Sequence, residues 1–532
     1  MAFSPAEWLS ENRDVYIGNA TAVRDFRVQL RGNRSVMLFG IYLLILVGIA
    51  VFVYDGATGQ NRTIYDAQQS LRDFYQLTMG LLGLAVIVVA PALTATTVVM
   101  ERQRQSIDLI FSAPVSPKYF LVGKMISSFR YTWMLLVLAL PVAAASVVLG
   151  GATWTDVLIA YLLLSLQGLI LTAFALLISS LVSKPVAAII WSYAVTFVYS
   201  MFALGAAGSA DVVLRYGRGT SGEASAAIAL SPVTLNDAAR TYTLLGTIHV
   251  PNWMLMLVFT LAVTKLCLLG AGTLLSSGGG KEVIGLRIHS LIAILAMSGI
   301  AGWVGWGYLS VTAAGSISGS PLSADALGAD FLTYSTVVLV VFLPFIACYG
   351  FDRDKRLQPN GLFSLKHIFD GTPGGGLPYL LAMIGCLYGG FAIAGWVNTK
   401  AWVGMSFWST AFFTACFWTL FWAIGRLASS LTNSVKTSRT ILFAVFLTLA
   451  VVPYPAFVAM TGVEDEAAKS SLWNFYMLHP VTTLTPEASL KTLPYGVFFL
   501  VLSAVLIGFS ERRTRQKLST IRNYDEQPYQ TA

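Results

Sequence analysis

The chain has 532 residues, of which 56% are apolar and only 11% are charged, and its mean hydropathy is +0.69. A soluble core cannot bury so large an apolar fraction, so the composition excludes an ordinary soluble protein and indicates a membrane protein. The net charge of +8 is interpreted as a signal for orientation and for anionic lipid, because nothing else in the sequence supports binding to nucleic acid.

The first 35 residues are polar and are predicted to form a cytosolic or interfacial segment. Four arginines recur there at helical spacing: Arg24, Arg27, Arg31 and Arg34. This spacing suits an amphipathic helix that lies in the membrane plane, with guanidinium groups at lipid phosphates. A plain basic flank of the first span would explain the same residues, and both interpretations stay open. Because no cleavable signal peptide is apparent, the first apolar run is expected to remain as a span.

Twelve apolar runs are long enough to cross a bilayer. Unpaired backbone groups are costly in hydrocarbon, and the runs lack the alternation of barrel strands, so helices are predicted. The fold class is therefore an all-α polytopic membrane protein. The runs are 36–54, 77–99, 125–149, 157–182, 186–205, 252–277, 288–311, 331–350, 377–397, 402–425, 440–460 and 493–510.

A short charged segment, ERQRQSIDLIFSAPVSPKYFLVGK at 101–124, separates the second and third runs. It begins with polar residues and then becomes amphipathic, with Ile107, Ile110 and Phe111 at helical spacing before Pro114. Such an apolar stripe favours a helix that docks on another protein. A solvated connector with incidental apolar residues is the alternative.

This segment resembles the membrane subunits of ABC exporters of the type-2 permease family. Those subunits carry E-R-E-x-G-T-L-E-x-L-L-x-T-P-x-S after the second span, followed by a Gly-Lys pair. The differences are Gln103 for the acid, Gln105 for the glycine and Ser106 for the threonine. The residues that fit are Glu101, Arg102, Asp108, Leu109, Ile110, Pro114, Ser116, Gly123 and Lys124.

The resemblance implies a coupling helix at 101–117 that sits on a separate ABC ATP-binding subunit, and an interfacial helix before the first span. It makes Glu101, Arg102 and Asp108 candidates for polar contacts with that subunit. Ile110 and Phe111 would be the apolar anchors, and the other candidates for this contact are Leu109, Pro114, Gly123 and Lys124. ATP and Mg²⁺ would be bound by the partner, and no cofactor is expected in this chain.

Few side chains in the runs could carry other chemistry. The twelve runs contain no acid, and Lys265 lies near the centre of the sixth. Lys265 could extend to the interface or could contact substrate or a neighbouring helix. The four cysteines lie within runs without a C-x-x-C pair, so they are interpreted as packing residues, and no metal site is predicted.

The chain is predicted to repeat at an offset near 250 residues. Pro91 corresponds to Pro344, and Ser-Ser-Leu at 179–181 corresponds to the same string at 429–431. Six spans in each half would make the halves parallel, so one chain would supply both and no second permease chain would be needed. One six-helix permease plus unrelated spans is the alternative. The predicted parts are 36–277, a Gly-rich linker at 278–287, 288–510, and a basic cytosolic tail at 511–532.

The second half has a weaker counterpart of the charged segment at 352–373. It begins with Asp352 and Arg353, and Leu365, Ile368 and Phe369 could form an apolar stripe. The Glu-Arg run and the Gly-Lys pair are missing. The resemblance therefore implies two unequal contacts with the ATPase.

The distribution of basic residues sets the orientation. With a cytosolic N-terminus, 24 of the 34 lysines and arginines fall on the inner side and eight on the outer side. This excess predicts that both termini are cytosolic, in a plasma (inner) membrane.

The expected function is the transmembrane subunit of an ATP-driven exporter. The chain has no G-x-x-x-x-G-K-[ST] loop, so ATP hydrolysis is expected in another polypeptide, and the chain is not expected to be an enzyme. A scaffold that transmits ATPase motion without transport would use the same segment. A twelve-helix secondary transporter is a weaker alternative, because such carriers usually place charges in their spans.

Overall fold

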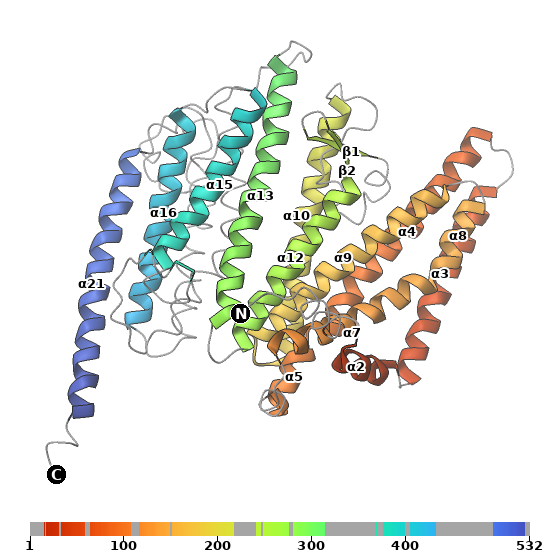
Figure 1. The fold of residues 1–532 in the computed structure, drawn as a ribbon. Coiled ribbons are helices and arrows are strands. Elements are labelled where there is room, and N and C mark those ends of the chain that lie inside the picture. Colours follow the sequence, from red (N-terminus) through yellow and green to blue (C-terminus); the bar gives the residue numbers. More distant parts are fainter. Residues whose placement is uncertain are drawn as a thin grey trace, which may run out of the picture. The chain divides into compact units, whose positions relative to one another are not determined.

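The computed structural model describes most of the chain as two compact units, which divide after Glu282. Figure 1 shows their helices along the sequence. The described residues are 15, 18–30, 33–58, 64–107, 116–148, 152–216, 241–245, 248–275, 280–313, 365, 368–369, 376–399, 405–431 and 493–526.

The first unit is a helical bundle with one short hairpin. Its elements in chain order are α2 (Ala20–Leu30), α3 (Asn33–Thr58), α4 (Ile64–Thr94), α5 (Thr97–Gln103), α7 (Pro117–Leu138), α8 (Leu140–Val148), α9 (Trp154–Leu181), α10 (Pro185–Tyr216), β1 (Tyr242–Leu245), β2 (Ile248–Pro251) and α12 (Asn252–Leu275).

Helix α9 is the centre of this bundle. It packs against α4, α7, α10 and α12, and 78% of its apolar window is buried, the largest share among the candidate spans in the described part of the chain. Leu82 of α4, Leu136 of α7 and Leu163 of α9 meet in the core. A capping box of Thr153 and Asp156 starts α9, because each side chain accepts a hydrogen bond from the other residue's backbone N–H.

Two of the predicted spans are interrupted. The third is divided into α7 and α8 at Ala139, two residues before Pro141, whose ring cannot continue the hydrogen-bond ladder. The second ends as α4 at Thr94, three residues after Pro91, and the chain turns before α5. Sequence hydropathy does not detect either break, because the residues remain apolar on both sides.

A β-hairpin precedes α12, and the all-α prediction did not include it. Tyr242 pairs with Pro251 and Leu245 with Ile248 in antiparallel register, and the Tyr242 and His249 rings meet edge to face. Figure 1 shows the hairpin at one end of the first unit, while α2 and α5 lie at the other end.

The second unit contains helices with an aromatic core. Tyr379, Phe407, Trp418, Trp422 and Phe499 are all buried there. Gly280–Glu282 of the first helix belong to the first unit. The described helices are α13 (Gly280–Ala313), α15 (Gly376–Thr399), α16 (Met405–Leu431) and α21 (Leu493–Glu526).

Ten of the twelve predicted runs fall on described helices, and 331–350 and 440–460 lie outside the described residues. Residues 280–287, assigned to the linker, are the first turns of α13, and 511–526 of the predicted tail continue α21.

Shorter apolar helices are Phe39–Gly48 and Pro185–Met201. Eight described segments are long and apolar enough to cross a membrane: Arg72–Gln103, Pro117–Val148, Trp154–Leu181, Asn252–Leu275, Glu282–Gly299, Gly376–Val397, Phe407–Ala428 and Leu493–Arg513.

Candidate functional site

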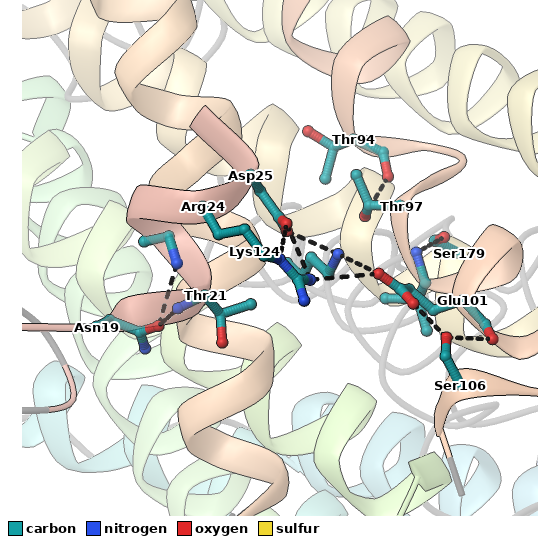
Figure 2. Close-up of polar contacts among 12 residues, drawn as sticks. Asn19, Thr21, Arg24, Asp25, Thr94, Thr97, Glu101, Ser106, Lys124 and Ser179 are labelled. Atoms are coloured by element: carbon teal, nitrogen blue, oxygen red, sulfur yellow. Dashed lines mark hydrogen bonds and ion pairs between the residues drawn. The ribbon is translucent and has the colours of Figure 1, made fainter. Parts of the chain in front are cut away.

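The charged segment that begins at Glu101 joins a junction of α2, α5, α7 and α9. Figure 2 shows the polar contacts of this junction. Helix α2 packs along α7, and α5 packs on α9. The four helices bring together residues that lie between 19 and 182 in the sequence.

Asn19 starts α2 and also fixes it to α7. Its Oδ1 accepts hydrogen bonds from the backbone N–H groups of Thr21 and Ala22 at 3.1 and 3.2 Å, as an N-cap does. Its Nδ2 donates to the Tyr119 carbonyl at 2.8 Å. The side chain is 1% exposed, so these bonds replace its hydration.

Gly123 allows this close approach. A Cβ at position 123 would lie 2.5 Å from Asn19 Oδ1 and 2.9 Å from Thr21 Cβ, inside the contact limit for both atoms. The glycine of the Gly-Lys pair is therefore a docking surface for the start of α2.

Lys124 of α7 forms ion pairs with both α2 and α5. Its Nζ lies 2.7 Å from Asp25 Oδ2 in α2 and 3.0 Å from Glu101 Oε1 in α5, and its side chain is only 6% exposed. Arg24 adds a second cation, 3.0 Å from Asp25 and 3.6 Å from Glu101. Two cations and two carboxylates thus form a balanced cluster, in which Figure 2 shows Lys124 between the two acids.

The turn after α5 is closed by the same glutamate. The Ser106 hydroxyl donates to the Glu101 carbonyl at 3.0 Å and also contacts the Glu101 carboxylate. Gln105 has a φ of 56°, the left-handed region that favours glycine. The resembled motif has glycine at the position of Gln105. Glycine adopts this left-handed conformation without strain, which explains its presence in the motif.

Helix α5 is joined to the end of α9 by side chains from both helices. Ser179 Oγ accepts hydrogen bonds from the backbone N–H groups of Val98 and Val99 at 3.1 and 3.2 Å. Arg102 donates to the carbonyls of Ser180 and Val182 at 3.0 and 3.4 Å. Ser179 therefore caps α5 from another helix, since the Thr96 side chain makes no capping bond.

Ion pairs and side-chain capping bonds join the four helices of the junction. The cluster around Lys124 joins α2, α5 and α7, and Ser179 and Arg102 join α5 to α9. Four of the predicted contact residues, Glu101, Arg102, Gly123 and Lys124, face this chain's own helices.

The remaining predicted residues divide into two groups. Arg27 is exposed on α2, and only the backbone of Arg34 is described. The others lie outside the described residues: Arg31, Asp108, Leu109, Ile110, Phe111, Pro114, Asp352 and Arg353.

Lys265 lies on an outward face of α12. It is exposed and follows Met254, Val258 and Leu261 on one stripe of that helix, all of them about half exposed. The lysine therefore does not belong to the core of the first unit.

Sequence reasoning missed Asn19, Asp25 and Ser179. Asp25 carries the one available signal, an acid among the arginines that precede the first span. Asn19 carries none, because short polar residues at helix ends are common, and Ser179 was noted only as part of the repeated Ser-Ser-Leu string.

The comparisons with known proteins agree with this structure. Residues 55–269 match the model of a family described as ABC-2 family transporter protein. No curated protein matches the chain. Such permeases are the multi-pass membrane components that work with ABC ATP-binding subunits. The match over 55–269 thus shows that this part of the chain is similar to the membrane domain of ABC-2 family transporters, which supports an ABC-2 type permease.

Proposed function

We propose that this chain is the transmembrane subunit of an ATP-driven exporter and that 101–117 couples it to a separate ATP-binding subunit. The partner would bind ATP and Mg²⁺, and both halves of the translocation path would come from this one chain. The N-terminus and the junction of α2, α5, α7 and α9 would lie on the cytosolic side.

One observation carries the proposal: the first residues of the predicted coupling segment are bound to the helices of the junction. Glu101 is bound to Lys124 and Ser106, and Arg102 is bound to the end of α9. A docking helix that transmits force needs a rigid base, because a flexible attachment would absorb the displacement.

The proposed motion follows from these contacts. ATP binding would draw the partner subunits together and displace 101–117. Because Ser179 and Arg102 join α5 to α9, the displacement would pass to the central helix of the first unit. The inward and outward states would then differ in their contacts with the ATPase, which is the free-energy difference that a population shift requires.

Copurification and ATPase measurements separate contact from transmission. The permease would be solubilised with its ATP-binding partner, and partner content and ATPase rate would be compared with those of the partner alone. Ile110→Ala with Phe111→Ala should reduce partner content. Glu101→Ala with Arg102→Ala should leave insertion intact and retain the partner, yet lose the stimulation of ATPase activity.

Arg104→Ala is the matched control, because this exposed arginine lies at the same helix end. It should retain both partner and stimulation. Full stimulation in the Glu101/Arg102 variant would contradict the coupling role. The absence of any ATP-binding subunit from wild-type preparations would contradict the proposed function itself.

A further inference from the structure

A group of buried hydroxyls lies in the first unit, where α3, α4, α8 and α9 pack together (Figure 1). Tyr42 of α3, Tyr75 of α4 and Tyr161 of α9 pack in one apolar cluster, and Tyr161 lies near both other tyrosines. Ser146 of α8 is 0% exposed and follows Ala143, a member of the same apolar cluster, by one helical turn. These four hydroxyl-bearing residues, Tyr42, Tyr75, Ser146 and Tyr161, are named the hydroxyl cluster.

Three of these hydroxyl oxygens are buried and have no hydrogen-bond partner among the described residues: those of Tyr42, Ser146 and Tyr161. A serine can turn its hydroxyl to a carbonyl of its own helix, as the threonine Thr78 does towards Phe74. A tyrosine cannot, because its hydroxyl lies at the far end of a ring that packing holds in place. The two tyrosine hydroxyls are therefore left unpaired inside an apolar core, where such a group is costly.

The hydroxyl cluster lies far from the junction of α2, α5, α7 and α9. Tyr161 precedes Ser179 by 18 positions in α9, which corresponds to about 27 Å of helix. This length is close to the thickness of about 30 Å of the hydrocarbon core of a bilayer. Substitutions in the hydroxyl cluster therefore leave the contacts between α5 and α9 untouched.

The surroundings of the hydroxyl cluster select an uncharged ligand. Its neighbours Leu46, Val157 and Leu164 are apolar, and a charged group would need a counter-charge there. An alcohol, ester or amide group needs none, since it can exchange hydrogen bonds with tyrosine hydroxyls. No acid, lysine, arginine or histidine occurs in the stretches of helix that form the site, which are 35–54, 74–94, 140–148 and 157–181.

We infer that the hydroxyl cluster is a binding site for the uncharged polar group of an amphiphilic molecule. The apolar part of that molecule would pack on the apolar residues around the hydroxyls. The inference does not rest on the proposed function, because a lipid of the bilayer and a transported compound offer the same chemistry.

Thermal unfolding of the full chain in detergent, after removal of lipid, tests the site with probes of equal chain length. These are 1-decanol, which is uncharged and polar, decanoate, which is charged, and decane, which has no polar group. Decanol at saturation should raise the melting temperature of the wild type by about 2–4 °C, and the other two should not. In Tyr42→Phe and Tyr161→Phe the decanol shift should fall to less than about half, because a hydrogen bond to the probe is lost.

Two results would overturn the inference. One is an equal shift with decanol and with decane or decanoate, and the other is an unchanged decanol shift in both tyrosine variants. Should Tyr161→Phe not accumulate in the membrane, Tyr42→Phe decides by the same criterion.

Tyr193→Phe is the matched control in the same unit, because the Tyr193 hydroxyl donates to the Val88 carbonyl at 2.7 Å. Without a probe this variant should lower the melting temperature, whereas Tyr161→Phe should leave it unchanged or raise it, since an unpaired hydroxyl is removed. With decanol, Tyr193→Phe should keep the wild-type shift. An equal fall in the two variants without a probe would show that the Tyr161 hydroxyl already has a partner, which contradicts the site.

ATPase measurements on the complex with the ATP-binding subunit distinguish the two sources of the ligand. If decanol raises the ATPase rate and Tyr161→Phe loses this rise, the site binds a transported molecule. If decanol stabilises the permease without changing the ATPase rate, the site binds a lipid of the bilayer. Both results support the site, and the decanol shift itself does not change if the proposed function fails for want of an ATP-binding subunit.

Discussion

Lys124 and Asp25 form an ion pair of 2.7 Å although they lie 99 positions apart in the chain. The pair joins α2 to α7, and Glu101 shares the same ammonium at 3.0 Å. Lys124, which the sequence analysis placed at the contact with the partner, thus forms ion pairs with two acids of its own chain.

A double-mutant cycle should measure this pair. Lys124→Met leaves two carboxylates facing each other with only Arg24 beside them, so it should destabilise the protein by about 3 kcal/mol. Asp25→Asn should cost less, and the two changes together should cost less than their sum. Thermal unfolding in detergent would give the coupling energy. Additive effects would show that the pair contributes nothing beyond its separate side chains.

Gly123→Ala should destabilise the docking of α2. The new Cβ meets Asn19 Oδ1 at 2.5 Å, and Asn19 cannot move without losing its capping bonds. We expect a loss of about 1–3 kcal/mol, typical of overpacking. Gly80→Ala in α4 is the control, because a Cβ there meets nothing within 4 Å. Equal melting temperatures for the two variants would contradict the close approach.

Gln105→Gly should stabilise the turn after α5. Glutamine at a φ of 56° is strained, and glycine removes about 1 kcal/mol of that strain. The same substitution at Gln103, the last residue of α5, should instead cost about 1 kcal/mol. Opposite shifts of the melting temperature are the expected result. Shifts of the same sign would refute the left-handed turn.

Ser179→Ala should weaken the joint between α5 and α9. The change leaves two buried N–H groups without their acceptor, at a cost of about 1–3 kcal/mol. Ser180→Ala is a close control, since that hydroxyl donates only to the Leu176 carbonyl of its own helix. Hydrogen exchange at Val98 and Val99 should rise in the first variant and stay unchanged in the second. Protection that persists in Ser179→Ala would argue against the cap.

Much of the fold was predictable because the sequence of a membrane span shows its hydropathy without reference to other segments. A run of about 20 apolar residues predicts a helix by itself, and ten of the predicted runs fall on described helices. The breaks at Thr94 and Ala139 were not predicted, because the residues on both sides of each break are apolar and hydropathy does not change there. The β-hairpin at 242–251 was missed for a different reason: each of its strands has only four residues, which is too short to show a clear alternation in the sequence.

The sequence by itself determined the membrane class and the ten apolar runs that fall on described helices, since composition and hydropathy depend on nearby residues alone. The direction in which Glu101, Arg102 and Lys124 point was decided only by the tertiary structure. A charged residue at a helix end looks the same whether it faces a partner or another helix of its own chain. Its counter-charge lies in a distant segment, so only the packing of α2 on α7 and of α5 on α9 brings the two together.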